Sequence, residues 1–120
     1  MLRELRLNNL AIIKKVDLEF NNGLIALTGE TGAGKSILLD GISLLIGERS
    51  SVDMIRTGAD NLFAEGVFSL TQDQIEKLTK LGFEIEDEEL IVARYLDKNL
   101  KSKITVNGMR ITVSKLKELM

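Results

Sequence analysis

The 120-residue sequence contains no cysteine, no histidine and no proline, and it has few aromatic side chains. The lack of cysteine excludes a disulfide framework and a thiolate metal site. The lack of histidine excludes imidazole acid–base chemistry and removes the commonest metal ligand. No run of residues is long and apolar enough to cross a membrane, and residues 1–4 do not open a signal peptide. With 44% hydrophobic and 28% charged residues, the composition predicts a single cytoplasmic globular domain.

The most informative part of the chain is a glycine-rich stretch at residues 29–36, with the sequence GETGAGKS. It fills every fixed position of the P-loop pattern G-x-x-x-x-G-K-[S/T], which wraps the phosphates of a nucleoside triphosphate. Glycine lets the backbone approach a ligand closely, and consecutive N–H groups form a nest for an anion. The predicted nucleotide-binding residues are Gly29, Glu30, Thr31, Gly32, Ala33, Gly34, Lys35 and Ser36.

Two side chains of this stretch have predicted roles. Lys35 can reach the β- and γ-phosphates, and the hydroxyl of Ser36 can coordinate Mg²⁺. The flanking sequence agrees, because residues 24–27 form a short apolar run typical of a buried strand. Residues 37–46 have the length and apolar content of a helix, and Gly47 is placed to end it. Strand, glycine loop and helix therefore follow in the order that a P-loop requires.

Alternation of apolar and polar residues predicts several strands with one solvated face, which favours antiparallel pairing. Residues 48–62 are predicted to be irregular. The other expected elements are strands around residues 4–8 and 15–20, a strand at 65–70, a helix with a capping box at 72–81, paired strands at 89–96 and 101–106, a hairpin turn at Asn107-Gly108, and a final helix capped by Ser114.

Charge is unevenly distributed along the chain, although the net charge is only −2. Residues 84–89 carry five acidic side chains in six positions, whereas residues 94–117 contain seven Lys or Arg and one Asp. The basic segment could meet phosphate groups of DNA or of another ligand. The alternative, which charge alone favours, is a solvated sheet face balanced by the acidic loop.

Four segments, taken in order, resemble the ATPase heads of SMC-type proteins and, within that group, the RecN family of bacterial DNA-repair proteins. They are residues 8–13 (NNLAII), 28–36 (TGETGAGKS), 53–58 (DMIRTG) and 104–108 (ITVNG). The resemblance covers essentially the whole chain. Many ATPases share the P-loop, whereas the four segments in this order are specific.

The resemblance implies an α/β fold of the P-loop NTPase class, an ABC- or SMC-head-like lobe with an antiparallel β-subdomain and a mixed core sheet. Residues 1–120 would form the N-terminal half of the head. It also implies binding of ATP and Mg²⁺, dimerisation of two heads around nucleotides, and a role in DNA double-strand break repair and recombination at the nucleoid. Residues 9–13 would lie near the base and ribose.

Arg56 is a further candidate for the nucleotide site. By the same resemblance it matches the arginine that follows the first helix of SMC-like heads, near the nucleotide and the DNA-facing surface. An ordinary loop arginine is an equally good interpretation, and the sequence leaves the two open.

Parts that this family uses for hydrolysis are not found in the sequence. No apolar run ends in the paired acids of a Walker B strand, because residues 83–88 alternate and lead into polar residues. Hydrolysis needs a carboxylate to position water, a second group on Mg²⁺ and, in this family, a signature motif from the opposing head. We therefore assign no catalytic residue and expect no turnover by this chain alone. The expected partners are the C-terminal half of the head and a second head, with DNA an open candidate and no membrane.

The chain is thus interpreted as either a fragment or a truncated gene product. The strand at residues 24–27 would keep an unpaired edge, which predicts a stability lower than the length suggests. Two other functions stay open. One is a module that binds nucleotide or a partner without turnover. The weaker one is an ABC transporter ATPase, which residues 8–11 disfavour, as does Phe20 being the only aromatic side chain before the loop.

Overall fold

The computed structural model describes residues 2–19, 32–48, 50, 52–99 and 101–119, and within residues 32–38 it describes the backbone only. The strand predicted at residues 24–27 and its edge lie outside these ranges. The elements, in chain order, are β1 (Leu2–Leu10), β2 (Ile13–Glu19), α1 (Gly32–Leu45), the 3-10 helix η1 (Val52–Met54), β3 (Asn61–Ser69), α2 (Gln72–Lys80), β4 (Glu89–Asp97), β5 (Ser102–Val106), β6 (Met109–Ile111) and α3 (Val113–Leu119).

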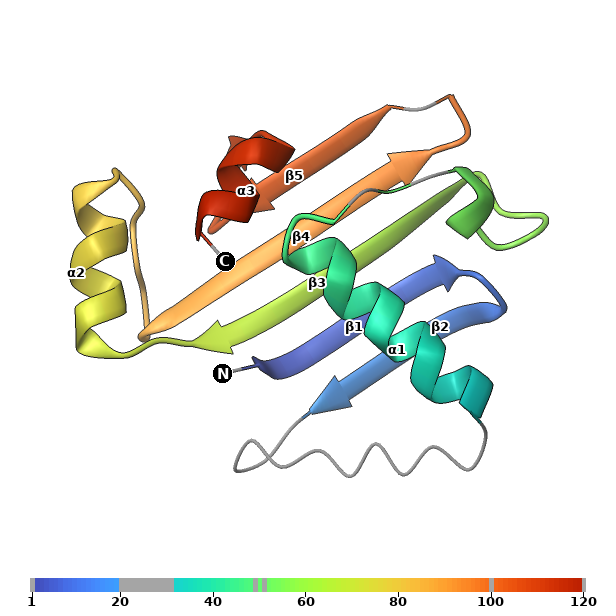
Figure 1. Cartoon of the computed structure of the whole chain (residues 1–120), viewed down its shortest axis with the longest axis horizontal. Helices are drawn as coiled ribbons and strands as arrows, with labels where there is room; N and C mark the ends of the chain where they lie inside the picture. The colour runs from blue at the N-terminus through green and yellow to red at the C-terminus, as the bar shows by residue number, and fades with distance from the viewer. Residues whose placement is uncertain (1, 20–31, 49, 51, 100, 120) are drawn as a thin grey trace.

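The described strands form one antiparallel sheet in the order β2-β1-β3-β4-β5-β6. Its first hairpin follows the predicted alternation, since Leu5 and Leu7 of β1 are fully buried and pair with Leu18 and Val16 of β2. Figure 1 shows α1 and α3 over one face of this sheet and α2 beyond one of its ends. The antiparallel pairing expected from the half-buried strands is confirmed.

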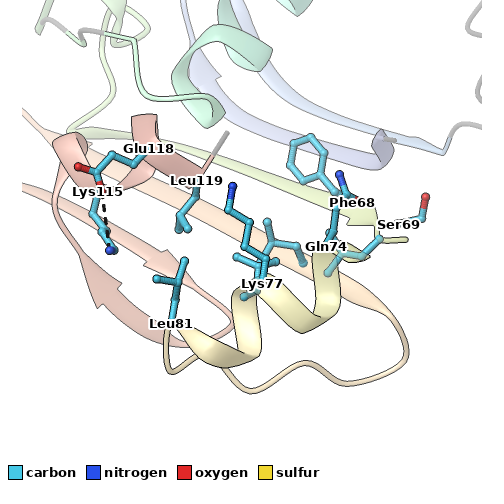
Figure 2. Close-up of a pocket in the computed structure, with 11 residues that line it drawn as sticks. Phe68, Ser69, Gln74, Lys77, Leu81, Lys115, Glu118 and Leu119 are labelled. Atoms are coloured by element: carbon cyan, nitrogen blue, oxygen red, sulfur yellow. Dashed lines mark ion pairs between the residues drawn. The ribbon is translucent and has the colours of Figure 1, made fainter. Parts of the chain in front are cut away.

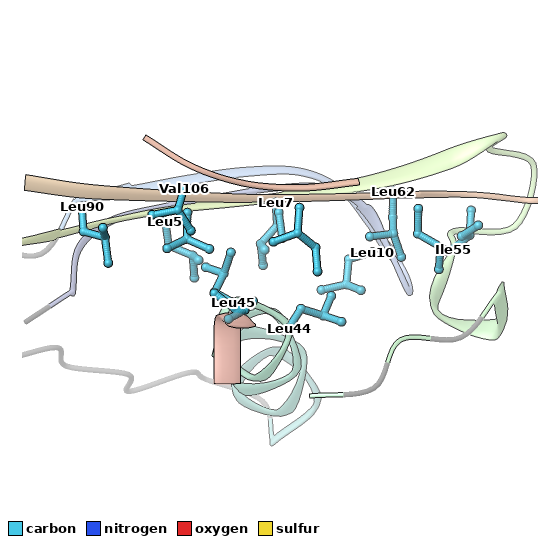
Figure 3. Packing of buried hydrophobic residues seen from close by; sticks show 14 of the residues in the cluster. Leu5, Leu7, Leu10, Leu44, Leu45, Ile55, Leu62, Leu90 and Val106 are labelled. Carbon is cyan, nitrogen blue, oxygen red and sulfur yellow. The ribbon is translucent and has the colours of Figure 1, made fainter. Parts of the chain in front are cut away.

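The hydrophobic core lies between the sheet and α1. Figure 3 shows Leu44 and Leu45 of α1 pointing toward the leucines of β1 and β3. Both helix residues are at most 1% exposed. Burying a leucine side chain contributes roughly 1.5–3 kcal/mol to folding, so these contacts fix the helix on the sheet. In the part of the chain that the structure describes, no helix is long and apolar enough to span a bilayer.

Two glycines bring α1 close to the sheet. A Cβ on Gly41, in the middle of the helix, would lie 2.6 Å from a Cδ atom of Leu7 on β1. In the opposite direction, a Cβ on Gly66 of β3 would lie 2.7 Å from a Cδ atom of Leu45. Distances this short are not tolerated between carbon atoms, so the missing side chains set the separation between helix and strands.

The C-terminal end of α1 is the glycine stop that the sequence predicts. Gly47 has φ +98°, a left-handed conformation that glycine adopts without strain. The N–H of Glu48 donates to the carbonyl of Ser43 at 3.0 Å, and the N–H of Gly47 donates to that of Leu44 at 3.4 Å. This pair of hydrogen bonds is a Schellman motif, which satisfies carbonyls that the helix itself leaves free.

The second half of the chain follows the predicted turn and cap signals, with one exception. The capping box of α2 is present, with Thr71 as the N-cap, and Asn107 and Gly108 both have positive φ in the hairpin between β5 and β6. The predicted cap of the last helix was wrong. Thr112 takes that position instead of Ser114, because its hydroxyl accepts the N–H of Lys115 at 3.1 Å.

Candidate functional site

The predicted P-loop runs directly into the first helix. The pattern placed the helix at residues 37–46, whereas α1 begins at Gly32, so its first residues are the last five of the motif. Of the predicted site residues, Gly29, Glu30 and Thr31 lie outside the described residues. Gly32, Ala33, Gly34, Lys35 and Ser36 are described in their backbone alone, as the start of α1.

The start of α1 has the properties of an anion site. The first N–H groups of a helix have no partner inside the helix, and the helix dipole places partial positive charge there. The first turn of α1 contains no acidic residue that would oppose an anion. The glycine-rich pattern of residues 29–36 runs into this helix start, which makes it the candidate position for phosphate groups.

Two further segments from the sequence prediction lie side by side. The N–H of Ala11 donates to the carbonyl of Met54 at 2.7 Å, and the N–H of Arg56 donates to the carbonyl of Asn9 at 2.7 Å. Leu10 and Ile55 form an isolated antiparallel bridge between these bonds. The turn between β1 and β2 and the segment that contains η1 therefore form one unit, although some 40 residues separate them in the sequence.

This unit lies toward the end of the sheet at which α1 begins. Figure 1 shows the turn between β1 and β2, the green η1 segment and the start of α1 at the same side of the molecule. The turn is strained, because Asn9 and Ala11 both have positive φ, at 58° and 52°. It leaves Ile12 77% exposed. An apolar side chain held out at this end could contact a nucleotide base.

Arg56 is half-buried, and its backbone is fixed at both ends of the residue. Besides its N–H bond to Asn9, its carbonyl accepts the N–H of Ala59 at 2.9 Å. Among the described residues, its guanidinium has no hydrogen-bond or ion-pair partner. The side chain is thus available for a ligand, and the two interpretations from the sequence remain open.

Arg94 on β4 lies at the opposite end of α1 from the P-loop pattern, and the sequence did not indicate its role. It is 2% exposed, and its Nη1 donates to the carbonyl oxygens of Leu44, at 2.9 Å, and of Glu48. Its Nη2 lies 3.3 Å from the hydroxyl oxygen of Ser50. A cation at the C-terminal end of a helix interacts favourably with the dipole. Burial lowers the pKa of Arg94, but an arginine side chain stays protonated in proteins.

The position of Arg94 also corrects the interpretation of the basic segment as a solvated face. Lys103 and Arg110 are exposed on the sheet, as that interpretation expects. Arg94 points the other way, into the core, because it occupies the buried phase of β4 together with Val92 and Leu96. The seven basic residues of this segment therefore do not form one surface.

A cavity of about 500 Å³ lies at the other end of the molecule. Figure 2 shows it between α2 and the end of α3, with Lys77 and Leu81 on one side and Leu119 on the other. An ion pair of 3.7 Å between Lys115 and Glu118 borders it. It lies far from the start of α1 in Figure 1 and is not part of the predicted nucleotide site. Within the described ranges, no cluster of three or more acidic side chains could hold a metal ion.

Comparison with curated proteins finds relatives that share one name. The chain is 40% identical over 121 residues to the DNA repair protein RecN of Bacillus subtilis, covering 99% of this chain and 21% of the relative. It is 38% identical over 120 residues to RecN of Vibrio cholerae, covering 99% of this chain and 22% of the relative. The chain thus spans about a fifth of the length of the curated relatives it matches.

Comparison with solved structures finds the same fold. A structure from work on ATP-driven dimerization and DNA-stimulated activation of SMC ATPases superposes with a TM-score of 0.79 at 24% identity, covering 98% of this chain and 76% of that one. The SMC head domain from Thermotoga maritima superposes with a TM-score of 0.68 at 22% identity, covering 98% and 41%. Similarity at this level establishes the fold, which is that of an SMC-type ATPase head.

A family model described as an AAA domain matches residues 4–119. The P-loop pattern at the start of α1, the head-like sheet and the relatives named above agree with this match. The chain therefore belongs to the AAA domain family, and its sequence is RecN-like.

Proposed function

We propose that this chain is the part of a RecN-like protein that binds ATP and Mg²⁺, and that the whole protein acts in the repair of DNA double-strand breaks. The observation that carries the proposal is the complete P-loop pattern running into the N-terminus of α1. A glycine-rich loop followed by free helix N–H groups is a site for a triphosphate. The names of the curated relatives support the role in DNA repair.

In this site, backbone N–H groups of residues 29–34 bind the phosphates. Lys35 supplies an ammonium for the β- and γ-phosphates, and Ser36 supplies a hydroxyl for Mg²⁺. The ion neutralises phosphate charge when it is bound. Buried contacts at the far end of α1, from Leu44 and Arg94, hold the helix against the sheet, so that its N-terminus is presented at a fixed position.

The unit formed by the turn after β1 and the segment after η1 completes the site. The turn between β1 and β2 lies at the end of the sheet where α1 begins. Its residue Ile12 is exposed and offers an apolar surface to the base. Arg56 has its backbone bonded to this turn and its guanidinium free of described partners, so it can contact a phosphate or the ribose. Arg56 is kept in the proposed site because its backbone is fixed and its guanidinium is free of described partners, and Ile12 because its side chain is exposed beside the same turn.

Hydrolysis belongs to a larger assembly. The chain covers about a fifth of its relatives, and it has no recognisable Walker B acids. We propose that the C-terminal half of the head and a second head supply the missing groups, in the cytoplasm at the nucleoid. The SMC ATPase structure with the same fold comes from work on ATP-driven dimerization, which supports this arrangement.

Binding of a fluorescent ATP analogue, with and without Mg²⁺, tests the proposal. Lys35→Ala should abolish binding, because the ammonium that faces the terminal phosphates is lost. Lys77→Ala removes the same charge from α2, beyond the other end of the sheet, and should leave the affinity unchanged. Equal affinity of the native chain and Lys35→Ala would overturn the site.

ATP turnover separates the proposed function from a module that only binds nucleotide. The chain alone should show none. When it is mixed with the C-terminal half of a RecN-like head, turnover should appear, and Lys35→Ala should remove it. A mixture that forms a complex without turnover would instead support the binding module.

A further inference from the structure

The sheet face opposite α1, here called the open face, carries an arrangement of side chains that the nucleotide site does not use. In each strand, the residues that alternate with the buried ones point to this face, such as Phe63 of β3 and Tyr95 of β4. Figure 3 shows α1 and α3 on the other side of the sheet, and Figure 1 shows α2 beyond its end. The described helices therefore leave the open face uncovered.

One row of residues crosses the open face over five neighbouring strands. The register pairs Lys15 with Asn8, Asn8 with Phe63, Phe63 with Tyr95, and Tyr95 with Lys103. We call these five residues the aromatic row. Adjacent strands lie about 4.8 Å apart, so the two rings occupy neighbouring positions and the two lysines lie at the ends of the row.

The centre of the row is hollowed. Phe63, Tyr95 and Lys103 line a cavity of about 390 Å³ together with Ala93 and Thr105 of the neighbouring row. Both of these neighbours are smaller than the two rings, and Arg94 also lines the cavity. Within the described part of the chain, the hydroxyl of Tyr95 has no hydrogen-bond partner. A hollow with two half-buried aromatic rings and a free hydroxyl suits a flat ligand.

The charges of the open face favour an anion at this row. Lys103 has no ion pair among the described residues. Lys15 lies 3.8 Å from Asp17, but both side chains are more than half exposed, and such a pair is weak and readily exchanged.

Acidic side chains also occur on the open face, in the rows on either side of the aromatic row, where Asp17 lies beside Lys15 and Asp97 follows Tyr95 along β4. Glu65 lies in the next row, where Arg6 neutralises it at 3.1 Å. Glu4 and Glu19 pair with each other in the row after that of Glu65, so the aromatic row itself contains two basic and no acidic side chains. A ligand with flat rings and negative charges is thus directed to the aromatic row.

We propose that the aromatic row binds single-stranded nucleic acid, with bases stacked on Phe63 and Tyr95 and phosphates near Lys15 and Lys103. Aromatic side chains on an open antiparallel sheet stack unpaired bases, because every base has a flat face that is free only when it is not stacked in a duplex. This site is separate from the ATP site, since it lies on the opposite face of the sheet from α1.

The fluorescence of Tyr95 gives a direct test, because the chain contains one tyrosine and no tryptophan. Titration with a short thymidine homopolymer should quench this signal and saturate, and a duplex of equal length should bind at least tenfold more weakly. Phe63→Leu keeps apolar volume but removes the ring, and it should weaken binding roughly tenfold. Ile91→Leu is the matched control, since Ile91 is exposed on the same face outside the row.

A second variant tests the phosphate contact without touching the rings. Lys103→Gln should lower the slope of log affinity against log salt by about 0.7, the value expected for one phosphate contact to a single strand. Lys77→Gln in α2 should leave the slope unchanged. Because Lys103 is exposed, its substitution should not disturb the core. Thermal unfolding of each variant checks that the fold is kept.

Three results would overturn the proposal. They are the absence of quenching, equal binding of duplex and single strand, and equal effects of Phe63→Leu and Ile91→Leu. A Tyr95 signal that changes with protein concentration alone would assign the face to contact between copies of the chain instead. Lys35→Ala should bind the homopolymer normally, so failure of the ATP site and failure of this site are distinguishable.

Discussion

The Nη1 atom of Arg94 lies 2.9 Å from the carbonyl oxygen of Leu44, and this hydrogen bond joins β4 to the end of α1 across 50 positions of sequence. The same guanidinium also bonds the carbonyl of Glu48, just beyond the helix. A side chain from the sheet therefore completes the C-terminal end of the helix whose other end begins within the P-loop.

Replacement of Arg94 should destabilise the fold. Arg94→Met keeps most of the apolar volume but leaves the carbonyls of Leu44 and Glu48 with fewer donors, so we expect a loss of about 2 kcal/mol in the free energy of unfolding. Arg94→Lys should recover part of it, because an ammonium donates but cannot reproduce the planar fork. Urea unfolding measures both. A Met variant as stable as the native chain would show that the buried charge costs as much as its hydrogen bonds contribute.

Substitution of Gly41 should reveal how closely α1 packs on β1. Gly41→Ala would stabilise an isolated helix by about 1 kcal/mol. Here its Cβ would meet Leu7 at 2.6 Å, and we expect a net loss of about 1–3 kcal/mol from overpacking. A double-mutant cycle with Leu7→Ala measures the coupling between the two positions. Additive effects in that cycle would contradict a direct clash.

Variants of the hairpin residue Asn107 should separate the contribution of its side-chain hydrogen bonds to stability from that of its backbone conformation. Its Oδ1 accepts the N–H of Ile91 at 2.7 Å, and its Nδ2 donates to the carbonyl of Glu84 at 2.8 Å, while its own φ is +49°. Asn107→Ala loses the bonds and adds left-handed strain, for a cost of about 2–3 kcal/mol. Asn107→Gly loses the bonds alone and should cost about 1 kcal/mol less. Thermal unfolding of the two variants tests this order.

Substitution of the exposed residue Ile12 tests the nucleotide site without a change in the stability of the fold. Ile12 is 77% exposed, so Ile12→Ser should leave the unfolding temperature unchanged within error. If this side chain contacts the base, the affinity for ATP should fall by roughly threefold to tenfold, and the affinity for inorganic triphosphate should not change. Competition binding with both ligands checks the prediction. An equal loss for both ligands would place the effect on the phosphates instead.

Local signals in the sequence predicted most of the elements correctly. The capping box of α2 and the Asn107-Gly108 hairpin turn depend on residues within four positions of one another, so they can be recognised without a tertiary structure. The predicted ends of the elements were less accurate. The strand expected at 65–70 begins at Asn61, because the register with β4 continues the pairing to Asp97.

Long-range contacts could not be predicted from the residues alone. The resemblance placed residues 9–13 and Arg56 near one site, and the structure shows them bonded to each other. Nothing local in the sequence marks Arg94 as the partner of α1, because its contacts lie 44 to 50 positions away. The aromatic row likewise exists only once five strands are in register, and alternation within one strand cannot reveal it.

The absence of side chains at Gly41 and Gly66 has a consequence for how variants of this protein should be read. Neither residue belongs to the predicted P-loop, yet each sets the height at which α1 sits above the strands. A side chain at either position would meet the end of a core leucine, so that either the leucine or the helix has to move. Where the helix moves, its first turn moves with it, and the phenotype resembles a lesion in the P-loop. Genetic screens that score only loss of function would therefore group these two glycines with Lys35, and a measurement of folding is needed to tell them apart.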